Sequence, residues 1–177
     1  MNGPEPDYRD VPPAEASKLL NAGGVVLVCT AGLDGRYDVA PVAWNCPLDY
    51  ERVSRLLVVL DPGHATFSNL EASREFALAL PTWMQKDLVN AAGSVSARDV
   101  DKYRAFAIAS SRGKAVDAFI PDGVAGALEC RVIDISRIGS VAVVSGEVLR
   151  AFAVPDAWKM RLHHAEGDIF FRPGERI

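Results

Sequence analysis

The stretch from residue 94 to residue 102, SVSARDVDK, brings together side chains that could hold an anion. Ser96 is followed three residues later by Asp99, a spacing that resembles a helix capping box. A helix that begins here would expose free backbone N–H groups, and Arg98 and Lys102 would lie on one face of it. Ser96, Arg98 and Lys102 therefore form a candidate phosphate site. The alternative is an ordinary capped helix on the surface.

Hydroxyl and amide groups gather a second time, directly after a strand-like run that ends in a Pro-Gly turn. Thr66, Ser68 and Asn69 follow His64 at what should be the N-terminus of a helix. These groups suit a ligand that carries many oxygen atoms. The alternative is that Thr66 or Ser68 only caps the helix.

A third candidate site surrounds a tryptophan in the stretch APVAWN, residues 40–45. Pro41 has no N–H group, so a nearby backbone carbonyl is left for a ligand donor. Ala43, Trp44 and Asn45 could then line a flat aromatic ligand. The alternative is that Trp44 belongs to the hydrophobic core.

Other kinds of chemistry lack their sequence signatures. The chain contains no GxGxxG, GxxxxGK[ST], GxSxG or HExxH motif. His163 and His164 with Glu166 could suggest a metal site, but adjacent histidines on an extended chain point to opposite faces and rarely bind one ion. No Ser-His-Asp set can be identified. We therefore expect neither a bound metal nor a catalytic side chain.

Composition indicates one soluble domain. The 177 residues are 49% apolar, which excludes a disordered chain, and the formal net charge of −4 argues against nucleic-acid binding. The three cysteines, Cys29, Cys46 and Cys130, form no CxxC pair and are expected to be buried, reduced thiols. No signal peptide is visible, and no apolar run approaches the ~20 residues of a membrane helix. We expect a cytoplasmic protein without membrane contact.

The elements that must position these groups are mostly strands. Residues 1–13 are expected to form an N-terminal arm. The pattern predicts strands over residues 25–30, 37–44, 56–60, 76–80, 126–136 and 141–153. It predicts short helices over residues 14–21, 64–75, 85–92, 100–107 and 155–162. An Asp-Gly pair at residues 34–35 predicts a hairpin turn. Because no long crossover helices separate the strands, we predict an antiparallel barrel with inserted helices.

Taken in order, these stretches resemble the flavin reductase-like family of FMN-binding split barrels, which includes flavoredoxin. The matching pieces span residues 25–175 and are DGRY (34–37), VAPVAW (39–44), DPGHAT (61–66), RDVDK (98–102), LEC (128–130), GEV (146–148) and LHH (162–164). The resemblance implies a mainly β, Greek-key antiparallel split β-barrel in a single domain over residues 1–177. It also implies a homodimer that binds FMN near the subunit interface.

The resemblance also assigns roles to the three candidate stretches. Ala43, Trp44 and Asn45 would lie beside the flavin ring, and Phe170 would close over it. Thr66, Ser68 and Asn69 would lie near the ribityl-phosphate chain. Ser96, Arg98 and Lys102 would bind the phosphate.

The implied activity is transfer of a hydride from NADH or NADPH to the flavin. The alternatives are a flavoredoxin-like electron carrier that is reduced by a partner protein, and a split barrel that binds another ligand such as haem. The sequence departs from the family pattern at four positions. Asp38 stands where Asn is common, Phe67 and Val141 where His is common, and Ala97 where Gly is usual.

Overall fold

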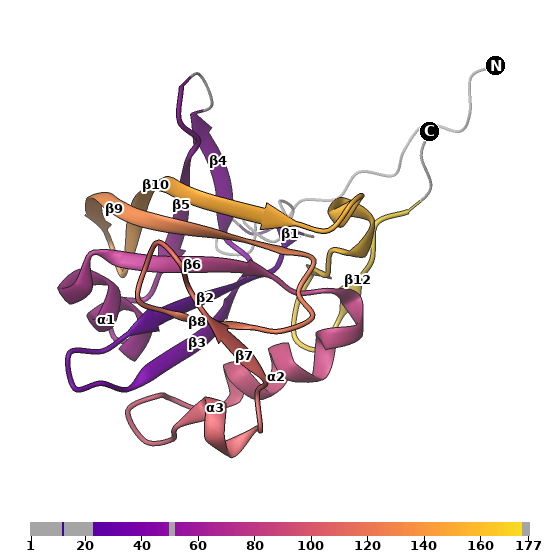
Figure 1. The fold of residues 1–177 in the computed structure, drawn as a ribbon, viewed down its shortest axis with the longest axis horizontal. Helices are drawn as coiled ribbons and strands as arrows, with labels where there is room; N and C mark the ends of the chain where they lie inside the picture. The colour runs from indigo at the N-terminus through magenta and orange to yellow at the C-terminus, as the bar shows by residue number, and fades with distance from the viewer. Residues whose placement is uncertain (1–11, 13–22, 50–51, 175–177) are drawn as a thin grey trace.

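The computed structural model describes residue 12, residues 23–49 and residues 52–174, so the expected helix over residues 14–21, and all but residue 12 of the expected arm, lie outside the described residues. Strands dominate the described part, and every strand pair in it is antiparallel (Figure 1). None of the helices in these ranges is long and apolar enough to cross a bilayer.

Seven strands form the main sheet, in the order β3-β2-β6-β9-β10-β5-β4. They are β2 (Val26–Ala31), β3 (Tyr37–Val42), β4 (Asn45–Asp49), β5 (Arg55–Leu60), β6 (Glu75–Leu80), β9 (Gly126–Ile138) and β10 (Val141–Ala153). A second sheet pairs β1 (Gly23–Gly24), β11 (His163–His164) and β12 (Phe170–Phe171), and a third pairs β7 (Ser110–Arg112) with β8 (Phe119–Pro121). The six predicted strands are all present, whereas β4 and the five strands of the two smaller sheets were not predicted.

The main sheet returns on itself through one bent stretch of chain. Its two outermost strands, β3 and β4, are consecutive in sequence and are separated only by Ala43 and Trp44. β3 pairs with β2, and β4 pairs with β5. At the bend, the Trp44 carbonyl accepts a hydrogen bond of 3.0 Å from the Val59 N–H group. The two ends of the sheet therefore meet at the bend, which is the arrangement of a barrel that is open along part of one seam.

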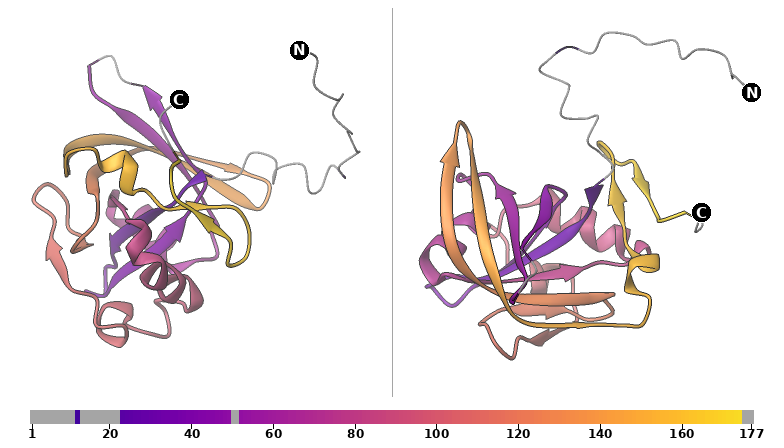
Figure 2. Two further views of the ribbon diagram at one scale, coloured as in Figure 1. Left: turned by 90° about the vertical axis from the view of Figure 1, so that its right-hand side faces the viewer. Right: turned by 90° about the horizontal axis from the view of Figure 1, so that it is seen from above.

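The hairpin predicted at the Asp-Gly pair is present, and a second hairpin joins β9 and β10. The turn between β2 and β3 places Gly35 at φ 78°, a left-handed conformation that favours glycine, and Ala31 pairs with Tyr37 across it. The hairpin of β9 and β10 turns at Gly139, with φ 59°. These two strands are 13 residues long, and they curve across the molecule as a two-stranded ribbon (Figure 2).

The main sheet packs against an apolar cluster on each of its faces. Val28 on β2 belongs to one apolar cluster, with Phe67 of α1 (Ala65–Ser73) and Phe76 of β6. Its neighbour Leu27 belongs to the cluster on the opposite face, with Val89 of α2 (Lys86–Ser94). Because successive side chains of a strand point to opposite faces, β2 contributes to both clusters and is buried along its whole length.

Most of the helices are shorter than the sequence predicts. α1 and α2 confirm two of the predicted helices, and a 3-10 turn, η2 (Trp83–Gln85), precedes α2. The helix predicted over residues 100–107 is only the four-residue α3 (Lys102–Ala105). The helix predicted over residues 155–162 is a 3-10 turn, η3 (Ala157–Met160). Asp156, which precedes η3, has the left-handed φ of 56°, so the backbone does not enter a regular α-helix there.

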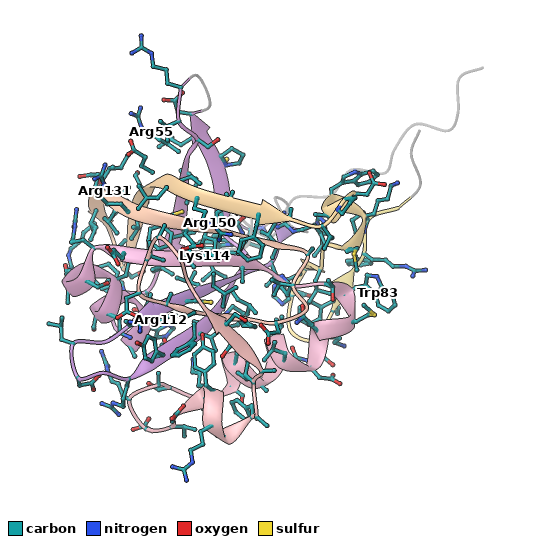
Figure 3. The ribbon with its side chains drawn as sticks, in the orientation of Figure 1. Arg55, Trp83, Arg112, Lys114, Arg131 and Arg150 are labelled. Atoms are coloured by element: carbon teal, nitrogen blue, oxygen red, sulfur yellow. The ribbon has the colours of Figure 1, made fainter. Side chains whose placement is uncertain are left out.

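A buried carboxylate holds the loop before β8 against β9. Glu129 is fully buried, and its Oε2 accepts hydrogen bonds from the backbone N–H groups of Ala115 and Val116. Its Oε1 pairs with the Arg150 guanidinium on β10. Figure 3 shows Arg150 and Lys114 close together on this face. One carboxylate thus ties a loop and two strands together.

The cysteines occupy two environments. Cys29 and Cys130 are buried, as expected, and burial raises the pKa of each thiol to about 12. Cys46 is exposed on β4, so the prediction that the three thiols are buried is wrong for this one. The three central residues of β4, residues 46–48, are all exposed.

Candidate functional site

A cavity of about 680 Å³ lies at the bend between β3 and β4. Its walls come from the end of β3 and the bend, the end of β5, the first residues of α1, one face of α2, and the hairpin of β11 and β12. The cavity is thus built where the two ends of the main sheet meet. A volume in this range suits a cofactor-sized organic ligand.

Three of the predicted ring-binding residues line this cavity, namely Ala43, Trp44 and Phe170. Trp44 is 51% exposed, so it is not a core residue and the alternative interpretation is wrong. Asn45 is not among the lining residues. Its Nδ2 donates to the backbone carbonyls of Gly24 (2.8 Å) and Ala43 (3.2 Å), so it fixes the bend that carries the tryptophan.

The N-terminus of α1 meets the same cavity. His64 is the N-cap residue, but no side chain caps the helix, so the predicted capping by Thr66 or Ser68 is wrong. Thr66 lines the cavity and is buried, and its hydroxyl donates to Asp38 Oδ2. Ser68 points elsewhere, with a hydrogen bond of 3.4 Å to the His64 carbonyl. The candidate residues of this stretch therefore divide between two places.

The second place is a small cavity of about 80 Å³ that is also lined by residues of α1. Ser68, Asn69 and Arg98 line it together. Arg98 Nη2 donates to Ser68 Oγ at 3.3 Å, so two sequence stretches meet as predicted. Asn69 Nδ2 donates to Thr30 Oγ1 at 3.2 Å, so its amide is already partly used.

Arg36 also lines this small cavity, although the sequence did not single it out as a binding residue. Its Nη1 donates to the Arg98 carbonyl at 3.0 Å, and its Nε pairs with Asp34 Oδ2 at 2.7 Å. Hydrogen bonds from Arg36 lower the pKa of the Asp34 carboxyl. The only signal was its place in the DGRY stretch, because the contact to Arg98 is long-range.

The backbone around Arg98 is a turn rather than a helix. Ser96 Oγ accepts a hydrogen bond of 3.2 Å from the Arg98 N–H group, and α3 begins only at Lys102. Its N-cap is Asp101, whose side chain accepts from the Arg104 N–H group. The predicted capping box from Ser96 is therefore wrong, and Arg98 and Lys102 do not share a helix face. Ser96 shapes the turn and is not among the residues that line either cavity.

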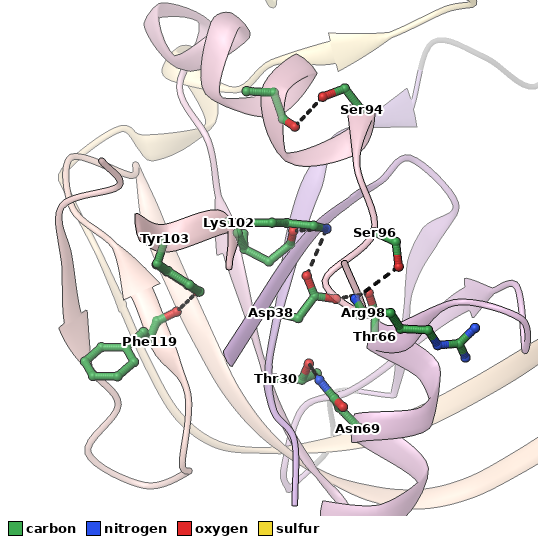
Figure 4. A network of polar contacts seen from close by, with 12 residues as sticks. Thr30, Asp38, Thr66, Asn69, Ser94, Ser96, Arg98, Lys102, Tyr103 and Phe119 are labelled. Carbon is green, nitrogen blue, oxygen red and sulfur yellow. Dashed lines mark hydrogen bonds and ion pairs between the residues drawn. The ribbon is translucent and has the colours of Figure 1, made fainter. Parts of the chain in front are cut away.

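Lys102 lies in the interior, where Figure 4 shows it directed at β3. It is 3% exposed, and its Nζ lies 2.8 Å from Asp38 Oδ1 and donates to the Val39 carbonyl at 2.9 Å. Asp38 is 1% exposed and also accepts the hydrogen bond from Thr66. A buried network of Asp38, Lys102 and Thr66 thus joins β3, α3 and α1. Its only member that lines the large cavity is Thr66.

The two cavities differ in charge. The described residues that line the large cavity include the carboxylates of Asp61 and Asp168 but no lysine or arginine. His64 is the basic partner of Asp61, with Nε2 and Oδ2 separated by 3.7 Å. The small cavity has two guanidinium groups and one carboxylate. The small cavity is therefore the better place for the anionic end of a ligand.

The remaining departures from the family pattern lie in different places. Phe67 is buried and lines the large cavity, and Ala97 lines the small one. Val141 pairs with Ile138 at the start of β10 and is not among the residues that line either cavity. His164 lines the large cavity, with its ring centroid 5.0 Å from that of Phe170.

Two known proteins are similar to this chain in sequence. The chain is 28% identical over 176 residues to the uncharacterized protein YddH of Escherichia coli K12, covering 92% of this chain and 93% of YddH. It is 28% identical to an FMN-binding domain of a flavin reductase-like enzyme from Shewanella baltica, with a TM-score of 0.74 and 94% of each chain covered.

The fold is also similar to that of an FMN-binding protein from Thermus thermophilus. That likeness has a TM-score of 0.84 at 22% identity and covers 97% of this chain and 98% of the other. The predicted split-barrel fold is thereby confirmed. A family model described as "Flavin reductase like domain" matches residues 19–170, which include both cavities and every strand of the main sheet. The chain belongs to the flavin reductase-like domain family.

Proposed function

We propose that the protein is a flavin-dependent oxidoreductase that holds FMN across the two cavities and reduces it with NADH or NADPH. The observation that carries the proposal is the large cavity at the bend, beside a small cavity that contains Arg98 and Ser68. The family of the chain and the FMN-binding proteins that share its fold support the same reading.

The residues present fit this cofactor. Pro41, Trp44 and Phe170 provide flat, largely apolar walls for an aromatic ring system. Arg98 and Ser68 provide a cation and a hydroxyl for a phosphate group, and their side chains are already in contact at 3.3 Å. The separation of carboxylates and guanidinium groups between the two cavities favours one orientation of the ligand, with the phosphate at the small cavity.

When bound, the flavin supplies the hydride and electron transfer. The protein positions it and limits its contact with water. Asn45 fixes the bend that carries Trp44, and Arg36 fixes the turn that carries Arg98. The buried pair of Asp38 and Lys102 joins β3, which leads into the bend, to α3, which follows the turn that carries Arg98. The proposed reaction requires no acid or base from the chain.

The test of this proposal uses the purified protein loaded with FMN in the absence of oxygen. Addition of NADH or NADPH should abolish the visible absorption of the oxidised flavin. Absorption that resists both nucleotides but is lost with dithionite would favour the flavoredoxin-like electron carrier, which requires a redox partner protein. A protein that binds haem and no flavin would overturn the proposal.

Arg98→Ala should weaken FMN binding by about 10- to 100-fold, because it removes a charge-assisted contact of ~1.5–3 kcal/mol. Riboflavin has no phosphate, so its affinity should stay within about twofold of the wild-type value. Titration of the apoprotein with each flavin measures both. Arg104→Ala is the control, since Arg104 is exposed on α3 and is not among the residues that line either cavity. An equal loss for both flavins would contradict a phosphate role.

We also propose that the protein forms a homodimer. Trp44 at the bend and Leu48 on β4 are 51% and 52% exposed, and apolar side chains of this size mark association surfaces when they cluster. Light scattering of the FMN-loaded protein should give twice the mass of one chain. A flavin-loaded monomer would contradict the proposal.

A further inference from the structure

The C-terminal hairpin forms one wall of the large cavity. His164 on β11 pairs with Phe170 on β12, and both line the cavity with Gly167 and Asp168 of the connecting turn. Among the described residues, β12 pairs with no strand other than β11, and β11 is attached on its other side to the two-residue β1. Strand pairing therefore connects the hairpin to the rest of the described structure along one short edge.

The turn of the hairpin is internally bonded. The Ala165 N–H group donates to the Ile169 carbonyl at 3.0 Å, and the Ile169 N–H group donates to the Glu166 carbonyl at 2.9 Å. Gly167 has φ 52°, a left-handed conformation that lets the chain reverse. These contacts give the hairpin a shape of its own, but they do not fasten it to the barrel.

Asp168 fastens the tip of the hairpin to α2. Its Oδ1 lies 3.2 Å from Lys86 Nζ and accepts a hydrogen bond of 3.0 Å from Asn90 Nδ2. Lys86 Nζ also donates to the Asp168 carbonyl at 3.3 Å and lies 5.3 Å from the centre of the Phe170 ring. Lys86 and Asn90 are one turn apart, so one face of α2 binds both sides of the tip.

The charges of Asp168 and Lys86 favour the position of the hairpin against α2. Hydrogen bonds from Lys86 and Asn90 lower the pKa of the Asp168 carboxyl, so it is charged at neutral pH. Views from two sides place the C-terminal segment beside α2 (Figures 1 and 2). The contact joins the C-terminal hairpin, and with it Phe170, to a helix that itself lines the cavity.

We propose that Asp168 is a latch that holds this hairpin over the cavity, so that its contact with Lys86 and Asn90 sets the rate at which a bound flavin leaves. The inference rests on the proposed function and adds to it. A latched hairpin keeps FMN as a resident cofactor that is reduced and reoxidised in place, rather than as a substrate released after each turnover. Asp168 is a positioning residue, because it acts through the hairpin that it holds.

The test is the dissociation rate of FMN from the loaded protein, measured from the return of free-flavin fluorescence after the loaded protein is diluted far below its Kd for FMN. Asp168→Asn and Lys86→Met should each accelerate release about three- to ten-fold. The double variant should be no faster than the faster single variant, because both changes remove the same contact. Salt at 1 M, with a Debye length of about 3 Å, should accelerate release more in the wild type than in Asp168→Asn, because in the wild type it screens the Asp168 contact as well as the contact between Arg98 and the phosphate.

Glu71→Gln is the matched control. It breaks another exposed ion pair, Arg137 with Glu71 at 2.8 Å, and neither residue belongs to the hairpin or is among the residues that line the large or the small cavity. A second readout needs no cofactor, namely hydrogen exchange of the peptide that spans residues 163–171 in the apoprotein. Exchange should accelerate in Asp168→Asn and remain unchanged in Glu71→Gln.

The outcomes separate the latch from the proposed function. Faster release together with faster exchange in Asp168→Asn supports the latch. An unchanged release rate overturns it, even where exchange accelerates, because the hairpin would then open without controlling the ligand. A wild-type protein that binds no flavin overturns the proposed function and, with it, the retention of a flavin by the hairpin. Unchanged exchange in that case shows that Asp168 does not fasten the hairpin at all.

Discussion

Replacement of Lys102 by methionine should lower the free energy of unfolding of the apoprotein by about 3–5 kcal/mol, because it leaves the Asp38 carboxylate buried without its cation. Asp38 and Lys102 are 1% and 3% exposed, and Nζ lies 2.8 Å from Oδ1. Urea unfolding of the apoprotein measures this loss. No flavin is present, so the result reports the structural role of the pair alone.

Two further variants separate the loss of the buried ion pair from the loss of any lysine. Lys114→Met removes an exposed lysine and should change the stability by less than about 0.5 kcal/mol. Adding Asp38→Asn to Lys102→Met removes the buried charge and should recover part of the loss. A Lys102→Met protein within 1 kcal/mol of the wild type would show that the buried pair contributes little to stability.

Glu129→Gln should cost about 1.5–3 kcal/mol at neutral pH, because it replaces the charged acceptor of three hydrogen bonds. Burial alone would raise the pKa of Glu129, but hydrogen bonds from the Ala115 N–H group, from Arg150 and from the Val116 N–H group outweigh it and hold the pKa below the usual 4.5. A lowered pKa in the folded state means that the stabilisation is fully present above the unfolded-state pKa and is lost as the pH falls through the folded value.

The difference in stability between wild type and Glu129→Gln should therefore be constant above about pH 6 and should shrink as the pH falls below the usual carboxyl value. Chemical unfolding at a series of pH values measures it. Glu71→Gln serves again as the control, since an exposed ion pair contributes less than about 1 kcal/mol. A difference that stays constant to acid pH would show that the charge of Glu129 is not what stabilises the loop.

Patterns that repeat along the chain allowed much of the barrel to be predicted. The β-branched run that becomes β2 and the Asp-Gly turn after it are local signals, and the structure contains both. β11 and β12 have two residues each, too few for alternation to be visible. Pro155, at the start of the helix predicted over residues 155–162, suits a first helical turn, but the left-handed backbone at Asp156 prevents an α-helix there.

The spacing of residues along the chain did not predict the contacts of the candidate site. Arg98 and Lys102 are four residues apart, but a turn separates them, so Arg98 reaches the small cavity while Lys102 enters the interior. The partner of Lys102 is Asp38, a departure from the family pattern that gave no local sign of a contact with α3. The contacts of Asp168 with α2 also join distant segments, and one sequence alone carries no signal of such pairs.

Ala43 and Trp44 connect the two ends of the main sheet and also line the large cavity. Ligand binding at this cavity and the stability of the fold are therefore thermodynamically linked. A ligand that contacts both β3 and β5 binds only the closed, folded chain. At a free concentration of 100 times its Kd it adds about 2.7 kcal/mol to the free energy of unfolding. The unloaded fraction of the protein is then the fraction most exposed to unfolding and proteolysis. The supply of cofactor in the cell would thereby regulate the amount of this protein as well as its activity.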